Sequence, residues 1–174
     1  MPARGTASGR AISVERALAI ARATASGRLN VDGSGGGGVA LTSGLAVRTA
    51  GDLTTTNVAP SWVDLTGMSV TITTGAHRCL ITVVASAKHS ASDTICLNLD
   101  IDGVSQGQAL GCCFADSLSS QNRNLSFSWL TAALTAASHT FKLQFATGSA
   151  GTMTVYASAG TEALVFGVME IDSP

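Results

Sequence analysis

The stretch Phe141-Lys142-Leu143-Gln144-Phe145 decides the fold class of this chain, because large apolar side chains alternate in it with polar ones. The same alternation recurs in Leu125-Ser126-Phe127-Ser128-Trp129. Successive side chains of a strand point to opposite faces of a sheet, so each stretch indicates a strand with one face in the core and one polar face. Both stretches therefore predict sheets rather than helices.

Similar segments lie on both sides of these stretches and are separated by turn residues such as Ala-Pro-Ser at 59–61, Thr-Gly at 66–67 and Asp-Gly at 102–103. The Asp-Gly pair predicts a two-residue hairpin loop between Ile101 and Val104. Many short strands without helices between them favour an all-β, antiparallel β-sandwich of jelly-roll type. The predicted strands are 45–57, 62–65, 68–74, 79–89, 94–101, 104–114, 124–134, 139–147, 153–157 and 163–171.

The core of this sandwich is predicted from the apolar positions of each alternating segment. It comprises Leu65, Val70, Ile72, Leu80, Val83, Leu97, Leu99, Leu125, Phe127, Trp129, Phe141, Leu143, Phe145, Val155, Leu164, Phe166 and Val168.

The sequence before the sandwich has a different character and predicts a separate arm. Residues 13–25 are alanine-rich, with Ser13 as a candidate N-cap, and they are the one stretch with helical periodicity. Residues 30–38 contain four consecutive glycines, which favour a flexible linker. We expect residues 1–38 to form an N-terminal anchoring arm with a glycine-rich linker, and residues 39–174 to form the sandwich domain.

Five arginines stand six residues apart in the arm, whereas Glu15 is the only acid among the first 28 residues. This segment therefore carries a side-chain charge of +4, although the whole chain has a formal net charge of −1. The spacing is compatible with solubility alone, but it also suits an arm that binds an acidic partner surface. We interpret the arm as a partner-binding segment whose contact residues are Arg4, Arg10, Arg16, Arg22 and Arg28.

Few charged residues occur in the rest of the chain, and only 12% of all residues are Asp, Glu, Lys or Arg. Between Ser105 and Ser138, Asp116 and Arg123 are the only charged side chains. A typical soluble domain has about 25% charged residues. So neutral a surface is poorly protected against association, and we expect much of it to be covered by other subunits. An extracellular domain that is merely rich in Ser and Thr is the alternative.

Residue patterns of catalysis or metal binding are missing from the sequence. The cysteines at 79, 96, 112 and 113 fit neither a redox pair nor a zinc site, and Cys79 and Cys96 are predicted to be small buried side chains. Asp100 and Asp102 lack the further oxygen ligands of a calcium loop, and the three histidines are far apart in the sequence. We therefore expect no catalytic residues, no metal and no cofactor, and we place an enzyme last among the hypotheses.

The aromatic residues and the apolar runs of the sequence indicate which partners and which location to expect. Trp62, Trp129 and Tyr156 are too isolated from Lys and Arg to form a nucleic-acid stacking surface, although Trp62 is a candidate glycan contact. The apolar runs are too short to span a bilayer, and the N-terminal stretch lacks the pattern of a secretory signal. We expect no nucleic-acid or membrane partner and synthesis in a host cytoplasm.

Several motifs in residues 54–171 resemble those of small jelly-roll domains in virion structural proteins of tailed bacteriophages. The matching motifs are Thr-Thr-Thr-Asn at 54–57, Trp-Val-Asp-Leu-Thr-Gly-Met-Ser-Val-Thr-Ile-Thr-Thr at 62–74, Leu-Asp-Ile-Asp-Gly-Val at 99–104, Leu-Ser-Phe-Ser-Trp-Leu at 125–130, Ala-Ala-Ser-His-Thr-Phe-Lys-Leu-Gln-Phe at 136–145 and Ala-Leu-Val-Phe-Gly-Val-Met-Glu-Ile at 163–171.

The resemblance implies a homotrimeric β-sandwich on a virion, such as a capsid decoration protein, a head fibre, or a tail-fibre or baseplate module. It supplies no catalytic residues. Its expected partners are further copies of the chain and a major capsid or tail protein. Because the sequence lacks collagen-like repeats and heptads before the sandwich, a compact decoration or spike subunit is favoured over a long fibre.

Two alternatives use the same fold. The first is a carbohydrate- or receptor-binding module that contacts a host surface glycan through Trp62. The second is a trimeric ligand of the C1q or tumour-necrosis type, against which the cysteine usage and the missing secretory signal argue. Fold alone does not choose between these functions.

Overall fold

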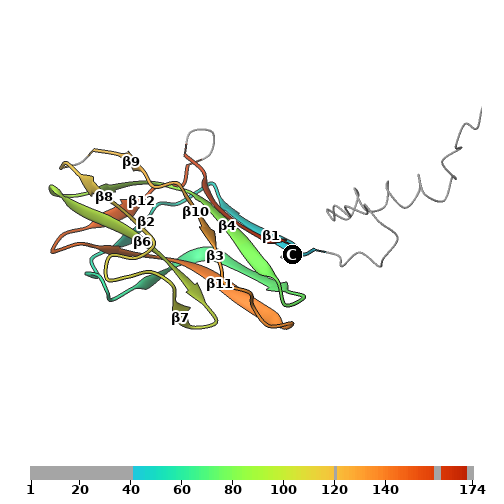
Figure 1. Cartoon of the computed structure of the whole chain (residues 1–174). Helices are drawn as coiled ribbons and strands as arrows, with labels where there is room; N and C mark the ends of the chain where they lie inside the picture. Colours follow the sequence, from blue (N-terminus) through green and yellow to red (C-terminus); the bar gives the residue numbers. More distant parts are fainter. Residues whose placement is uncertain (1–40, 120, 159–161, 172–174) are drawn as a thin grey trace, which may run out of the picture. The chain divides into compact units, whose positions relative to one another are not determined.

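The computed structural model describes residues 41–119, 121–158 and 162–171, which form thirteen strands and contain no helix (Figure 1). The predicted anchoring arm, with its five arginines, lies outside the described residues. The strands are β1 (Ser43–Arg48), β2 (Leu53–Thr55), β3 (Val63–Thr73), β4 (Arg78–Val84), β5 (Ser86–His89), β6 (Asp93–Ile101), β7 (Val104–Ser105), β8 (Cys113–Ser117), β9 (Arg123–Asn124), β10 (Phe127–Leu130), β11 (Ser138–Thr147), β12 (Met153–Val155) and β13 (Leu164–Ile171).

The strands form three antiparallel sheets. Sheet A has the order β1-β13-β4-β10, and sheet B has the corresponding order β2-β12-β5-β9. Sheet B continues sheet A, because each of its strands is a chain neighbour of a strand in sheet A; β4 and β5, for example, are separated by Ala85 alone. Sheet C has the order β3-β11-β6, and both β7 and β8 pair with β6.

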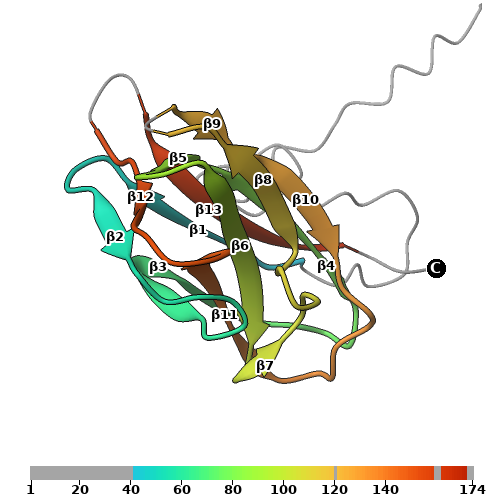
Figure 2. The same cartoon turned by 90° about the vertical axis from the view of Figure 1, so that its left-hand side faces the viewer.

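Sheets A and B together form one layer of a sandwich, and sheet C forms the other (Figures 1 and 2). The buried side chains come from both layers, for example Phe166 and Ile81 from sheet A and Phe141 and Leu97 from sheet C. Alternation places these side chains in the core because every second residue of each strand points inward. The prediction of an all-β, antiparallel β-sandwich is therefore confirmed.

Strand boundaries differ from the predicted ones where glycine or a bulge interrupts the pairing. The predicted break at 66–67 lies inside β3, where Gly67 has a φ of 81° and the register with β11 shifts between Lys142 and Gln144. The extra residues of β3 are absorbed by this bulge, so two predicted strands are one. The predicted strand 104–114 is wrong between residues 106 and 112, which form a loop between β7 and β8.

The predicted hairpin between β6 and β7 is confirmed, since Ile101 pairs with Val104. Asp102 and Gly103 have φ values of 54° and 85°, as a type I′ turn requires at both central positions. The Asp100 carboxylate accepts a hydrogen bond from the Gly103 N–H at 2.9 Å and thereby fixes the turn.

Most predicted core residues are buried, but three are not. Phe127 and Trp129 are half-buried and pack against the core. Leu80 is wrong as a core residue, because its neighbours Cys79 and Ile81 occupy the core and Leu80 points out of sheet A. The run from Cys79 to Val84, in which Thr82 is the one polar residue, conceals the register because apolar side chains lie on both of its faces.

Candidate functional site

The candidate glycan contact Trp62 is half-buried and lies just before β3. A Cβ added to Gly111 would lie 2.8 Å from the end of the Trp62 ring, so the ring packs against the loop between β7 and β8. The structure thus places Trp62 as an anchor for this loop. Glycan contact at Trp62 stays a prediction.

Beside Trp62, a row of polar side chains crosses the outer face of sheet C. Lys142 Nζ and Gln144 Nε2 each donate to the Asp64 carboxylate at 2.8 Å, and Asn98 Nδ2 donates to Gln144 Oε1 at 3.0 Å. The hydrogen bonds from Lys142 and Gln144 hold the pKa of Asp64 below its ordinary value, and Asp64 in turn raises the pKa of Lys142. Because these groups bind one another across three strands, the row ties β3, β11 and β6 together.

The loop between β7 and β8 is held down on Asn98, which is fully buried. Asn98 donates to Ser105 Oγ at 2.8 Å and accepts from the Gly107 N–H at 3.0 Å. Main-chain bonds complete the attachment, since Cys112 N–H donates to the Leu97 oxygen at 2.9 Å. A Cβ on Gly111 would lie 2.3 Å from that same oxygen, so the loop approaches β6 closely only because this position has no side chain.

The two aspartates near the hairpin serve the turn, as solvation and turn formation would predict. Asp102 accepts from the Thr140 N–H at 2.7 Å and lies 2.6 Å from His139 Nδ1. These contacts, the bond from Thr140 first, lower the pKa of Asp102. The pKa of His139 is raised, chiefly by Asp102 and then by the main chain of Thr135. The pair therefore attaches β11 to the hairpin.

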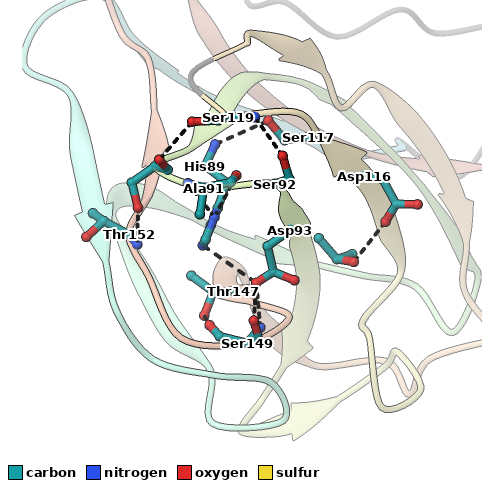
Figure 3. A network of polar contacts seen from close by, with 12 residues as sticks. His89, Ala91, Ser92, Asp93, Asp116, Ser117, Ser119, Thr147, Ser149 and Thr152 are labelled. Atoms are coloured by element: carbon teal, nitrogen blue, oxygen red, sulfur yellow. Dashed lines mark hydrogen bonds and ion pairs between the residues drawn. The ribbon is translucent and has the colours of Figure 1, made fainter.

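A second polar network surrounds His89 at the end of β5 (Figure 3). His89 is fully buried, its Nδ1 lies 3.1 Å from both the N and the O of Ala91, and its Nε2 lies 3.7 Å from Asp93 Oδ2 without a hydrogen-bond partner. Asp93 Oδ2 accepts from both the N–H and the hydroxyl of Ser149, at 2.7 and 2.8 Å. Burial would raise the pKa of Asp93, but bonds from Thr94 and Ser149 outweigh this effect and lower it.

The network contains Ser, His and Asp side chains but lacks the arrangement of a catalytic triad. In the described part of the chain, neither ring nitrogen of His89 hydrogen-bonds to a serine hydroxyl; the Ser117 hydroxyl instead accepts from the His89 main-chain N–H at 3.4 Å. A triad requires the base to bind the nucleophile and the acid to orient the base. The contacts instead close the end of the sandwich, joining β5, β6, β8 and the turn after β11.

A buried carboxylate lies at the opposite end of sheet A, where the described chain begins. Glu170 Oε1 accepts from the Gly75 N–H at 2.5 Å and lies 3.0 Å from His77 Nδ1, whereas Oε2 accepts from the N–H and hydroxyl of Thr42 at 3.0 and 3.2 Å. Burial alone would raise the pKa of Glu170, but the bonds from Gly75, Thr42 and His77 lower it. Glu170 therefore fixes the chain where it enters β1.

The four cysteines are free thiols. Cys79 and Cys96 are buried as predicted, and burial raises the pKa of each to about 11. Cys112 and Cys113 are half-buried, and burial raises the pKa of each of them as well. A raised pKa keeps a thiol protonated and unreactive at neutral pH. Within the described residues, no group of three or more His, Cys, Asp or Glu side chains is arranged to hold a metal ion.

The outer face of sheet A is an exposed apolar surface that sequence reasoning missed. Cross-strand register places Val47, Val165 and Val84 in one row, and Met169, Leu80 and Leu130 in another. We call this surface the sheet A face; its outward-pointing residues are Ser43, Leu45, Val47, Arg78, Leu80, Thr82, Val84, Ser128, Leu130, Val165, Gly167, Met169 and Ile171.

Exposure on the sheet A face is high for apolar side chains. Leu45 is 67% exposed, and Val47, Val84, Leu130 and Met169 are 47% to 51% exposed. The outer face of sheet C carries Asp64, Lys142 and many threonines, so the two outer faces differ in polarity. Apolar patches of this kind on a soluble protein mark interaction surfaces. The signal in the sequence was the run from Cys79 to Val84, in which five of the six residues are apolar.

No helix among the described residues is long and apolar enough to cross a membrane.

Comparisons with known proteins find little. No family model matches the chain, and no curated protein matches it. Two solved structures of infectious bursal disease virus are similar. The Gt strain structure has a TM-score of 0.39 and 12% identity, with 80% of this chain and 41% of that chain covered. The Gx strain structure has a TM-score of 0.37 and 13% identity, with 76% of this chain and 38% of that chain covered. The chain thus spans less than half of either, and likeness at this level does not determine function.

Proposed function

We propose that this protein is a non-enzymatic structural protein of a virion that works as a homotrimer, with capsid decoration or a spike as its role. The observation that carries the proposal is the exposed apolar sheet A face. Isolated soluble domains rarely expose an apolar face of this kind, whereas a subunit of an oligomer buries it against a neighbouring subunit. The low content of charged side chains, 12% of the chain, supports the same conclusion.

The narrower assignment to the jelly-roll type is supported by strand order. If each pair of consecutive strands in sheets A and B is counted as one strand and β7 is left out, eight strands remain. Numbered 1 to 8 along the chain, these strands are β1 with β2, β3, β4 with β5, β6, β8, β9 with β10, β11, and β12 with β13. Their order is 1-8-3-6 in one layer and 2-7-4-5 in the other. A jelly roll is a double-sheet fold of eight strands and two Greek keys. Such folds host many functions, so the virion role rests on the surface and on the resemblance of residues 54–171 rather than on topology.

The mass of the purified protein in solution tests the homotrimer. We expect sedimentation equilibrium at micromolar concentration to give three times the chain mass of 17.5 kDa. The mass should be independent of salt between low and moderate ionic strength, because apolar contacts are not screened. A monomer under these conditions would contradict the proposal.

The attachment role of residues 1–38 needs a separate experiment. We expect a variant lacking these residues to remain a trimer of its shorter chain and to keep the thermal stability of the full-length protein, but to lose binding to virus particles. A matched variant changes Arg4, Arg10, Arg16, Arg22 and Arg28 to Gln, which removes the positive charge and keeps the length. If the shortened variant still decorates particles, the arm is not the attachment segment. If only the Gln variant still does, the arm attaches without its arginines. Candidate partners of the arm are a major capsid protein or a tail protein.

A further inference from the structure

We propose that the sheet A face of one copy binds a second apolar patch on the next copy, which lies on β8. The proposal rests on the homotrimer above and names the two surfaces that such a trimer would use. Around a threefold axis every contact joins two different surfaces, because only a twofold axis brings a surface against itself. Each subunit of a trimer therefore needs two contact surfaces.

The second surface is formed by Phe114 and Leu118, which are 58% and 55% exposed. Phe114 lies on β8, and Leu118 follows the strand directly. Residues 114, 116 and 118 project to one side, since side chains of an extended chain alternate. In the described part of the chain β8 pairs only with β6, so no strand is hydrogen-bonded in register to its other edge. We call Phe114, Asp116 and Leu118 the β8 patch.

The size of the sheet A face suits one half of a subunit contact. Four strands of about six residues cover roughly 400 Å² of sheet plane, at about 4.8 Å between strands and 3.3 Å per residue. A stable interface buries about 800 Å² on each partner, of which the centre is apolar and the rim polar. The sheet A face therefore supplies the apolar centre, and its polar neighbours supply the rim. Ser43 and Arg78 lie at its border, whereas Thr82 and Ser128 lie in its middle row with Gly167.

Charge favours pairing of the two unlike surfaces. Of the residues that make up the sheet A face, Arg78 alone is charged, and it lies at the border opposite Ile171. The β8 patch carries Asp116 between its two apolar side chains. Arg123 donates to the main-chain oxygen of Asp116 at 3.2 Å, while Asp116 Oδ1 accepts from Thr94. A sheet A face offers no carboxylate to Arg78 of another copy, whereas the β8 patch offers Asp116.

Two variants, each with one surface disrupted, test the pairing. Leu45→Glu introduces a carboxylate on the sheet A face, and Phe114→Glu introduces one on the β8 patch. Both positions are exposed, so each protein should keep its fold, which a thermal melt verifies. Ser69→Glu adds the same charge to the exposed outer face of sheet C and serves as the matched control. The readout is mass by sedimentation equilibrium at micromolar concentration.

We expect the wild type and Ser69→Glu to be trimers, and each interface variant alone to be a monomer of 17.5 kDa. Mixed in equal amounts, the two variants should form a dimer of twice that mass. The intact sheet A face of Phe114→Glu then binds the intact β8 patch of Leu45→Glu. A third subunit of either kind would have to bind through a disrupted surface, so the ring cannot close.

Other results overturn the inference and leave the homotrimer to be judged by the wild type alone. If Leu45→Glu remains a trimer, the sheet A face is not a contact between copies and another partner covers it. If Phe114→Glu remains a trimer, the β8 patch is not involved. If both variants are monomers but their mixture stays monomeric, the two surfaces do not bind each other. A wild-type monomer would instead overturn the proposed homotrimer itself.

Discussion

Replacing Gly111 by alanine is expected to destabilise the domain by about 3 kcal/mol or more. Two effects add at this position. Gly111 has a φ of 82°, which costs a residue with a side chain about 1–2 kcal/mol. In addition, the new Cβ would lie 2.3 Å from the main-chain oxygen of Leu97, which belongs to a central strand and has little freedom to move away. The loop would lift from β6, and buried Asn98 Oδ1 would lose the hydrogen bond from the Gly107 N–H.

Gly103→Ala is the matched control for this substitution. Gly103 has nearly the same φ, 85°, but nothing lies within 4 Å of the position that its Cβ would take. Gly103→Ala should therefore cost only about 1 kcal/mol, the conformational part of the effect. Denaturant unfolding of both variants at one pH gives the two free energies, provided that the m-values agree. Equal losses in the two variants would show that the close approach of Gly111 to Leu97 contributes nothing.

Glu170→Gln is expected to cost about 2 kcal/mol at pH 7, although the two side chains have nearly the same shape. The carboxylate accepts hydrogen bonds at both oxygens, from Gly75 on one side and from Thr42 on the other. The glutamine amide has a single oxygen, so its NH₂ group must face one of these N–H donors. The Glu170 side chain is fully buried, and water cannot replace the lost bond.

The cost of Glu170→Gln should depend on pH in a defined direction. The pKa of Glu170 is lower in the folded protein than its ordinary value, so the carboxylate contributes stability above the unfolded pKa of about 4.3. This contribution is lost as pH falls through the folded pKa. The difference in unfolding free energy between wild type and variant should therefore be constant near neutral pH and shrink below about pH 4. A difference that does not change with pH would argue against a charged Glu170.

Thr42→Val separates the stability contribution of the Thr42 hydroxyl from that of the Glu170 carboxylate. The substitution removes the hydroxyl, which is 3.2 Å from Glu170 Oε2 and 2.7 Å from the Thr73 oxygen, and leaves the Thr42 N–H in place. We expect a smaller loss, about 1 kcal/mol, because Thr42 is only half-buried and water can replace its bonds. A larger loss for Thr42→Val than for Glu170→Gln would show that the hydroxyl, not the carboxylate, fixes the start of β1.

The fold class was predictable because local alternation reports which side of a strand is buried. Phe141, Leu143 and Phe145 are all in the core, and the Asp102–Gly103 turn has the predicted conformation. Interruptions that depend on pairing were not predictable. The bulge that makes β3 one strand exists only in its register with β11, and the loop at 106–112 is held by Asn98, whose role no local pattern indicates.

The candidate surface could not be predicted for a different reason. A strand that is apolar on both faces gives no alternation, so Leu80 was assigned to the core while Cys79 and Ile81 occupy it. Only the register of β1, β13, β4 and β10 shows that Leu45, Val84 and Met169 share one outer face. The low content of charged residues indicated that the protein associates with other subunits. It did not indicate which surface does so, because composition does not specify which residues become neighbours in space.

The position of Glu170 has a mechanical consequence. Glu170 lies near the end of β13, and its bonds to Thr42 join the place where the chain enters the sandwich to the place where the last strand leaves it. A force that pulls these two points apart acts at one end of the β1–β13 ladder, where Ser43 faces Met169. The ladder then opens one residue pair at a time instead of shearing as a whole. The hydrogen bonds between Glu170 and Thr42 lie just outside the first residue pair of the ladder, so they bear the force before any pair of the ladder does.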